Sequence, residues 1–177
     1  MLVVGRQADQ IAHRSIPGWF PEENEQELSR LILEHGIRSV IDVGAFVGKS
    51  TVFFAQRVAR VFSVDTFQGT DEHYLSTVPQ LVANMRREFD RNTAAYHNVQ
   101  VFAADSLEAA KFSPIVDLVY IDASHKYNDV VLDIEAWAPL AGKVLCGDDY
   151  HWPEVRAAVD RHVPGVQSTG RFWWVET

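Results

Sequence analysis

The chain has 177 residues, 47% of them hydrophobic, and a formal net charge of −8 at pH 7. This length suits one domain, and the apolar fraction is that of a globular protein and not of a disordered one. The net negative charge argues against nucleic acid as the main partner, because phosphate binding requires clustered lysine and arginine. The single cysteine, Cys146, cannot form an internal disulfide, so nothing in the sequence requires an oxidising compartment.

Targeting signals are not evident in the sequence. No apolar stretch approaches the roughly 20 residues that span a bilayer, and the N-terminus lacks the basic start and length of a signal peptide. We therefore expect a cytoplasmic protein with neither a membrane nor a nucleic-acid partner. Residues 1–20, with a turn at Pro17-Gly18, are expected to be an irregular N-terminal extension, and residues 21–177 a single domain.

From residue 21 onward, short apolar runs alternate with amphipathic stretches, which is typical of a parallel sheet covered by helices. The expected strands are 39–43, 61–65, 99–103, 116–121 and 143–146. The expected helices are 21–35, 50–58, 78–92, 107–111, 127–137 and 153–162. The tail, 166–175, is interrupted by Gly170 and reads as a closing antiparallel hairpin. The sequence therefore predicts an α/β fold with a Rossmann-like, doubly wound, mostly parallel sheet and a C-terminal antiparallel hairpin.

An acidic residue stands at or just beyond the end of each of the five expected parallel strands. These residues are Asp42, Asp65, Asp105, Asp122 and the pair Asp148 and Asp149. In doubly wound sheets, ligands bind outside the carboxyl ends of the strands. The acids therefore predict a ligand site at that edge of the sheet.

A glycine-containing loop, with Gly44 and Gly48, follows the first strand and suits close approach to a ligand. One alternative is a nucleotide triphosphate, because Gly48-Lys49-Ser50 ends like a P-loop. A P-loop, however, needs glycine where Val43 stands, and Asp42 would repel polyphosphate. A dinucleotide is a second alternative, but the fingerprint G-x-G-x-x-G is absent.

S-adenosylmethionine is the third candidate for this loop, and it has no phosphate and carries a positive sulfonium. An acid beside the glycine turn is favourable for such a ligand. Asp65 could accept hydrogen bonds from two ribose hydroxyls, and Ala104-Asp105-Ser106 could address the adenine edge. For Asp105 a helix cap is the alternative role.

Four stretches carry a resemblance to a known family: 40–51, 64–70, 120–127 and 147–150. In these stretches the chain resembles class I S-adenosylmethionine-dependent methyltransferases, and within them the branch of macrocin-type sugar O-methyltransferases. The resemblance implies that the chain binds S-adenosylmethionine. The cofactor-binding residues it implies are Asp42, Gly44, Ser50, Asp65, Thr66, Asp105, Ser106 and Asp122.

The resemblance also implies a divalent metal, most simply Mg²⁺, on Asp122, Asp148 and Asp149. The strands that precede these acids are expected to be neighbours, so their carboxylates should converge, and oxygen ligands favour Mg²⁺, Mn²⁺ or Ca²⁺ over zinc. Asp122 and His125 are the candidate catalytic residues, either of which could act as the base. His151 is an ordinary loop residue or a further base or metal ligand.

The sequence thus predicts a metal-assisted O-methyltransferase that acts on a small hydroxylated molecule, such as a sugar or secondary metabolite. The rival function is a non-catalytic S-adenosylmethionine-binding module. Trp19, Phe20, the rest of residues 1–20 and the loop 66–76 are expected to border the pocket. The sequence also allows a homo-oligomer in which a second subunit completes the mouth of the pocket.

Overall fold

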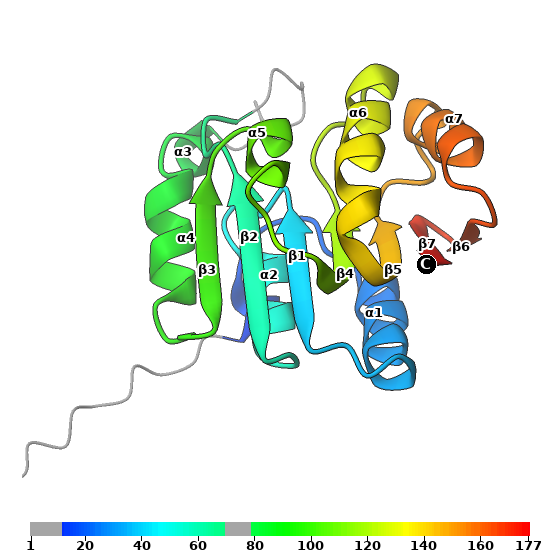
Figure 1. Ribbon diagram of the computed structural model, residues 1–177. Helices are drawn as coiled ribbons and strands as arrows, with labels where there is room; N and C mark the ends of the chain where they lie inside the picture. The colour runs from blue at the N-terminus through cyan, green and yellow to red at the C-terminus, as the bar shows by residue number, and fades with distance from the viewer. Residues whose placement is uncertain (1–11, 70–78) are drawn as a thin grey trace, which may run out of the picture.

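A computed structural model describes residues 12–69 and 79–177. Its centre is a seven-stranded sheet in the order β3-β2-β1-β4-β5-β7-β6 (Figure 1). The strands are β1 Ser39–Val43, β2 Arg60–Asp65, β3 Val99–Ala103, β4 Val116–Ile121, β5 Ala141–Gly147, β6 Gln167–Thr169 and β7 Phe172–Glu176.

The pairing pattern is that of a doubly wound sheet. Strands β1 to β5 are all parallel, while β7 is antiparallel to β5 and β6 is antiparallel to β7. The chain runs outward from β1 to β3 and then returns to place β4 on the other side of β1. This reversal between β1 and β4 is where ligands bind in such sheets. The predicted fold class and the closing hairpin are therefore confirmed.

Helices cover both faces of the sheet, with α5 and α6 in front and α1 and α2 behind in Figure 1. The helices are α1 Glu22–Glu34, α2 Lys49–Ala55, α3 Pro79–Val82, α4 Met85–Thr93, α5 Ser106–Ala110, α6 Tyr127–Trp137 and α7 Pro153–His162. Alternate strand residues serve two cores: Val40 packs with α1, α2 and α4, whereas its neighbour Ile41 packs with α5, α6 and α7. Burial on both faces explains why these strands read as nearly continuous apolar runs.

One expected helix is wrong in its extent. The sequence predicts a single helix over 78–92, but the described part is two helices, α3 and α4, separated at Ala83 and Asn84. The Asn84 side-chain amide donates to the carbonyl of Gln80 at 2.8 Å, and its backbone N–H donates to Leu81. Side-chain bonding of this kind competes with the regular helix ladder, so α3 ends and α4 starts afresh.

Residues 12–20 pack against the domain. Ile16 and Phe20 are buried in the same core as α1 and α2, after a short 3₁₀ turn at His13–Ser15. The side chain of His13 lies 3.0 Å from Glu25 of α1. The described part of the predicted extension is therefore tied to the sheet by both apolar and polar contacts.

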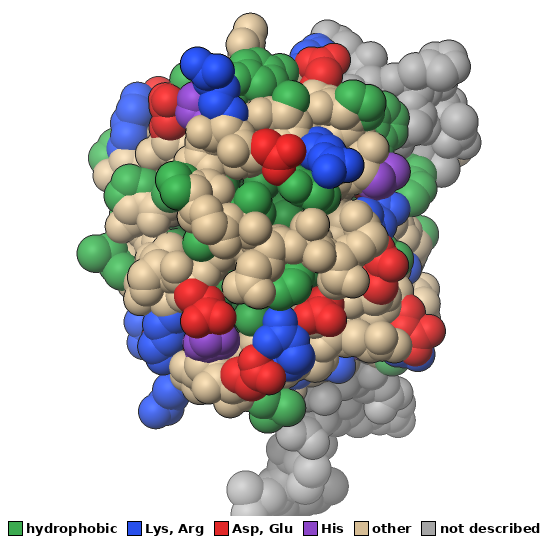
Figure 2. Space-filling model, turned by 90° about the vertical axis from the view of Figure 1, so that its right-hand side faces the viewer, with side chains coloured by type: hydrophobic (Ala, Val, Ile, Leu, Met, Phe, Trp, Pro, Cys, Tyr) green, Lys and Arg blue, Asp and Glu red, His purple; other side chains and the backbone are tan. Residues whose placement is uncertain are grey.

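The two edge strands of the sheet are β3 and β6, and the three residues of β6 are polar and exposed. On the face of the molecule that carries the β6 edge, acidic, basic and hydrophobic side chains are interspersed and not gathered by kind (Figure 2). A short, polar edge strand resists pairing with other chains. Across the described ranges, no helix combines the length and the apolarity needed to cross a bilayer.

Candidate active site

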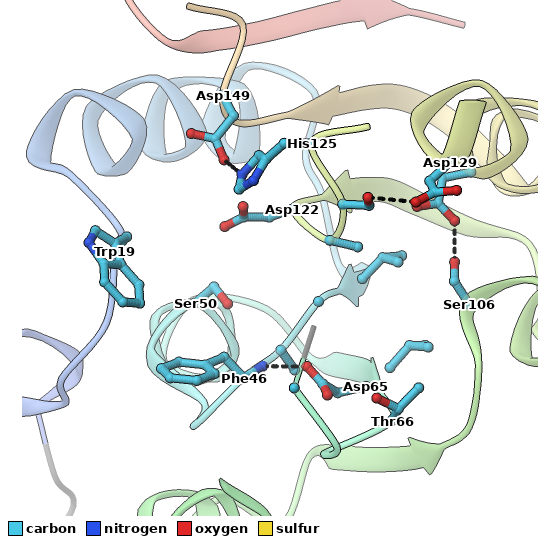
Figure 3. A pocket seen from close by; sticks show the side chains of 18 of the residues that line it. Trp19, Phe46, Ser50, Asp65, Thr66, Ser106, Asp122, His125, Asp129 and Asp149 are labelled. Carbon is cyan, nitrogen blue, oxygen red and sulfur yellow. Dashed lines mark hydrogen bonds and ion pairs between the residues drawn. The ribbon is translucent and has the colours of Figure 1, made fainter. Parts of the chain in front are cut away.

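A cavity of about 490 Å³ opens at the carboxyl ends of the parallel strands, over the switch point between β1 and β4. The predicted site residues that line it are Gly44, Ser50, Asp65, Thr66, Asp105, Ser106, Asp122, His125 and Asp149. Figure 3 shows Asp65 and Thr66 on one side of this space and Trp19 on another, with Asp122 between them. One edge of the sheet therefore brings together most of the residues that the sequence singled out.

The loop between β1 and α2 forms the floor of the cavity. Gly44 has φ +91°, and a Cβ there would lie 1.9 Å from the backbone oxygen of Asp122. Its N–H, like that of Ala45, donates to the carbonyl of Val64. Only glycine fits this position, so the bare backbone of the loop borders the ligand space.

Asp42 lies beneath this loop and does not line the cavity. Its carboxylate is fully buried and accepts hydrogen bonds from the hydroxyls of Ser50 (2.9 Å) and Thr51 (2.6 Å). Burial raises the pKa of Asp42 to about 6, although both hydroxyls act in the opposite direction. Through these hydrogen bonds, Asp42 fixes the first turn of α2.

Lys49 and Ser50 have partners that a nucleotide-binding P-loop would not give them. The Lys49 ammonium donates to the carbonyl of Gly18 at 2.9 Å, and the Ser50 hydroxyl donates to Asp42. Lys49 therefore holds the N-terminal segment against the loop. The nucleotide alternative is not supported by this arrangement.

Asp65 closes β2 and organises the next loop. One of its oxygens accepts the N–H of Phe46 at 2.8 Å, and the other accepts that of Phe67 at 2.6 Å. Burial raises the pKa of Asp65, and these two bonds only partly offset that effect. Each carboxylate oxygen has two acceptor sites, so both can also accept from a ligand hydroxyl.

Asp105 and Ser106, which follow β3, already form hydrogen bonds with other residues of the chain. Asp105 caps α5 by accepting the N–H groups of Leu107 and Glu108, which is the alternative role weighed from sequence. The Ser106 hydroxyl donates to Asp133 at 2.5 Å and accepts from the Trp137 indole at 2.7 Å. An adenine contact by the Ser106 side chain would compete with these bonds, whereas Asp105 uses only its Oδ1 to cap α5.

Asp122, Asp148 and Asp149 converge as the sequence predicts, and we call them the carboxylate cluster. One oxygen from each lies within 4.8 Å of the others. Asp148 is buried, and its Oδ2 has no hydrogen-bond partner within residues 12–69 and 79–177. A buried carboxylate oxygen without a partner is costly unless a cation or proton meets it. The cluster therefore fits a divalent cation bound through oxygen atoms.

The three members of the carboxylate cluster differ electrostatically. Burial, and then the negative charges of Asp148 and Asp149, raise the pKa of Asp122 well above its usual range. Burial and Asp149 also raise the pKa of Asp148. For Asp149 burial acts in the same direction, but the hydrogen bond from His125 and neighbouring positive charges outweigh it and lower its pKa. Asp149 is thus the member held most firmly as a carboxylate.

His125 stands beside the carboxylate cluster. Its Nε2 lies 2.5 Å from Asp149 Oδ2 (Figure 3). Its ring stacks on the indole of Trp152, with centroids 4.8 Å apart. His151 is 3.9 Å from the same aspartate but about half exposed. The imidazole of His125 is therefore held at the cavity wall by contacts on its edge and on its face.

Arg171 and Asp133 are two of the cavity residues that the sequence did not single out. Arg171, from the turn before β7, donates to Asp148 at 2.6 Å and also to Asp149. Asp133 lies on the buried face of α6, and burial raises its pKa to about 6 against the hydrogen bond from Ser106. For Asp133 the signal was an acid on the helix face that also carries Val130 and Trp137. For Arg171 we find no such local signal.

The N-terminal segment borders the cavity, as predicted. Gly18 and Trp19 line it, and the Trp19 ring lies 6.1 Å from that of Phe46. Phe20, expected at the pocket mouth, is instead buried against Phe53, with ring centroids 5.1 Å apart. Of the predicted 66–76 loop, residues 66 and 69 line the cavity and 70–76 lie outside the described residues.

Known proteins resemble this chain in sequence and in fold. The family model described as "Methyltransferase domain" matches residues 41–150. An uncharacterized protein, y4gI of Sinorhizobium fredii, is 32% identical over 111 residues, which cover 58% of this chain but only 12% of that protein. The chain thus spans about an eighth of the length of this curated relative.

Solved structures of other proteins share the fold, among them two that are cofactor-bound or in complex with SAH. Cofactor-bound Rv0187 from MTB has a TM-score of 0.64 and 18% identity, with 92% of this chain and 84% of that one covered. An O-methyltransferase from Bacillus cereus in complex with SAH has a TM-score of 0.62 and 17% identity, with the same shares covered. The family match spans more than half of the chain, so the chain belongs to the methyltransferase domain family.

Proposed function

We propose that the chain, as a member of this family, transfers a methyl group from S-adenosylmethionine to a hydroxyl group of a small molecule. In this proposal a divalent metal on the carboxylate cluster and His125 prepare the hydroxyl. The observation that carries it is the shared cavity: the glycine loop, Asp65, His125 and two members of the cluster, Asp122 and Asp149, all line one space. Methyl transfer needs its donor and acceptor side by side, and this space offers a place for each.

Several features of the cavity support S-adenosylmethionine as the donor. Gly44 leaves backbone open to the ligand, and Asp65 has acceptor sites to spare for ribose hydroxyls. The cavity is lined by several carboxylates, which suit a sulfonium cation and disfavour phosphate. The Bacillus cereus enzyme, which shares this fold, is described in complex with SAH, the product of such a donor.

The orphaned oxygen of Asp148 and the oxygen-only donor set support a metal on the carboxylate cluster. Asp122, Asp148 and Asp149 would hold the ion, and such ligands favour Mg²⁺, Mn²⁺ or Ca²⁺. When bound, the ion would orient the substrate hydroxyl and stabilise the oxyanion left by loss of its proton.

In this proposal the protein's own groups handle the proton. His125 accepts the proton from the substrate hydroxyl, because Asp149 stabilises the imidazolium that forms. Asp122 is not the base in this proposal, because it is a ligand of the metal ion. The hydroxyl oxygen then forms a bond to the methyl carbon as the carbon–sulfur bond breaks. The sulfonium thereby becomes the neutral thioether of S-adenosylhomocysteine. Trp19 and Trp152, which are 49% and 44% exposed and line the cavity, offer apolar faces to the substrate body.

Calorimetry tests the cofactor part of the proposal. The protein should bind S-adenosylmethionine and S-adenosylhomocysteine and gain no thermal stability from ATP or NAD. Clear affinity for ATP without affinity for either sulfur compound would contradict the proposal and revive the nucleotide alternative.

A methyl-transfer screen against hydroxylated metabolites, including sugars, tests the chemistry. Turnover should require Mg²⁺ or Mn²⁺ and stop in excess chelator. Asp122→Ala and Asp148→Ala should abolish it while S-adenosylhomocysteine still binds. Full activity in chelator would leave a metal-free general-base enzyme, and cofactor binding with no turnover on any acceptor would favour a non-catalytic binding module.

A further inference from the structure

The fold fixes the position of Arg171 through its backbone contacts. It follows Gly170 in the turn between β6 and β7. Its backbone N–H donates to Glu23 of α1 at 3.0 Å, and its carbonyl accepts from the N–H of Tyr150 at 2.9 Å. These contacts aim a side chain that is only 25% exposed into the cavity.

The Arg171 guanidinium occupies part of the carboxylate cluster. Its Nε donates to Asp148 Oδ1 at 2.6 Å, and its Nη2 donates to Asp149 Oδ1. The second oxygen of Asp149 faces His125. Among the residues that the structure describes, Asp148 Oδ2 has no hydrogen-bond partner, and the carboxylate of Asp122 accepts only a long hydrogen bond from the Tyr120 hydroxyl, at 3.3 Å.

We propose that Arg171 is a built-in counter-cation that shares the carboxylate cluster with a divalent metal ion. It stabilises the metal-free protein and weakens metal binding. This inference rests on the metal part of the proposed function. It adds that the protein sets its metal affinity with a side chain that is not a ligand.

Arg171 opposes metal binding in two ways, through its positive charge and through the carboxylate oxygens that it occupies. Three carboxylates this close repel one another, and one guanidinium cancels only part of that repulsion. The remaining negative charge still attracts a divalent ion, but the ion must enter beside a fixed positive charge and use oxygens that Arg171 leaves open. At contact distances in a partly buried site, such a charge changes an affinity by on the order of tenfold or more.

The test is a titration of the 177-residue chain with MnCl₂, followed by calorimetry, for the wild type and two neutral variants. Arg171→Met removes the charge and keeps the apolar stem, and Arg171→Gln retains one donor for a carboxylate if the methionine variant folds poorly. We expect both to bind Mn²⁺ about tenfold or more tightly than the wild type, and to melt at lower temperature without metal.

Arg156→Met is the matched control, because it makes the same change in net charge. Arg156 lies on α7, pairs with Asp160 at 3.7 Å and is 63% exposed. Its affinity for Mn²⁺ should stay within about twofold of the wild type, since solvent screens an exposed charge. Tight binding by this variant as well would trace the effect to net charge and overturn the role given to Arg171.

The remaining outcomes separate the two proposals. Mn²⁺ binding by the wild type that is unchanged or weaker in both Arg171 variants would overturn this inference and leave the metal site standing. Binding only after Arg171 is neutralised would support the inference strongly. No Mn²⁺ binding by any variant would overturn the metal part of the proposed function together with this inference, while the same samples would still show whether S-adenosylhomocysteine binds.

Discussion

The backbone carbonyl of Asp122 fills the space that a side chain on Gly44 would need. A Cβ built on Gly44 lies 1.9 Å from that oxygen and 2.6 Å from its carbon. The two residues follow the neighbouring strands β1 and β4, so their loops pack backbone to backbone. The glycine loop is thus in direct backbone contact with Asp122 of the carboxylate cluster.

Gly44→Ala should therefore disrupt the site. The added methyl meets rigid backbone, and φ of +91° is unfavourable for alanine. We expect loss of S-adenosylhomocysteine binding and destabilisation by at least about 2–3 kcal/mol, measured by calorimetry and urea unfolding. Gly36→Ala is the control, because Gly36 also has positive φ but its Cβ would meet nothing within 4 Å. That variant should lose only about 1 kcal/mol and keep its ligand affinity, and equal losses in both would show that backbone conformation alone explains the effect.

Asp65→Ala should weaken S-adenosylhomocysteine binding by about 1.5–3 kcal/mol, because ribose hydroxyls would lose a charged acceptor. Asp117 provides a control of the same kind at the opposite end of the sheet. It also accepts two backbone N–H groups, those of Arg38 and Ser39, at 2.8 and 3.0 Å. Asp117→Ala should lower stability and leave the affinity of the folded protein unchanged, as calorimetry would show. An Asp65 variant that binds as tightly as the wild type would remove this residue from the cofactor site.

His125→Ala should reduce methyl transfer by about a hundredfold or more, since general-base catalysis has that magnitude. S-adenosylhomocysteine affinity should change little, because His125 lies on the metal side of the cavity. His151→Ala is the control, since His151 is near the same aspartate but about half exposed. If the two variants retain the same turnover number, His125 is not the base and Asp122 becomes the leading candidate.

Much of the fold could be predicted because four of the five parallel strands, β1, β2, β4 and β5, are largely buried on both faces of the sheet. Their apolar runs are hard to mistake, and every expected strand overlaps an observed one. The break at Asn84 could not be foreseen from periodicity, because it depends on one side chain bonding to the preceding turn. The burial of Phe20 likewise depends on where Phe53 of α2 comes to lie.

The site was predictable to the extent that it follows from topology. Acids that end adjacent parallel strands must meet at one edge, and Asp122 does meet Asp148 and Asp149. Arg171 reaches the same cluster because the C-terminal hairpin folds back along β5. No local sequence pattern predicts the direction in which a side chain of a hairpin turn will point. Asp42 shows the converse: it stands in the expected stretch, but its carboxylate serves Ser50 and Thr51 beneath the loop.

Asp133 gives a prediction for the pH dependence of stability. Burial raises its pKa from an ordinary 3.8 to about 6, against the hydrogen bond from Ser106. As pH rises from about 4, the unfolded chain releases this proton first, while the folded protein keeps it until about pH 6. The contribution of Asp133 to stability is therefore present in full below about pH 4 and is lost as pH rises through about 6.

Asp133→Asn removes this loss, because an amide does not ionise and its oxygen can still accept from Ser106. We expect the variant to match the wild type near pH 4 and to be more stable by up to roughly 3 kcal/mol above pH 6, as urea unfolding at a series of pH values would measure. The low-pH arm is the internal control, since both side chains are neutral there. A stability difference that stays constant across the series would contradict this prediction. It would mean that the pKa of Asp133 is the same in the folded protein and in the unfolded chain.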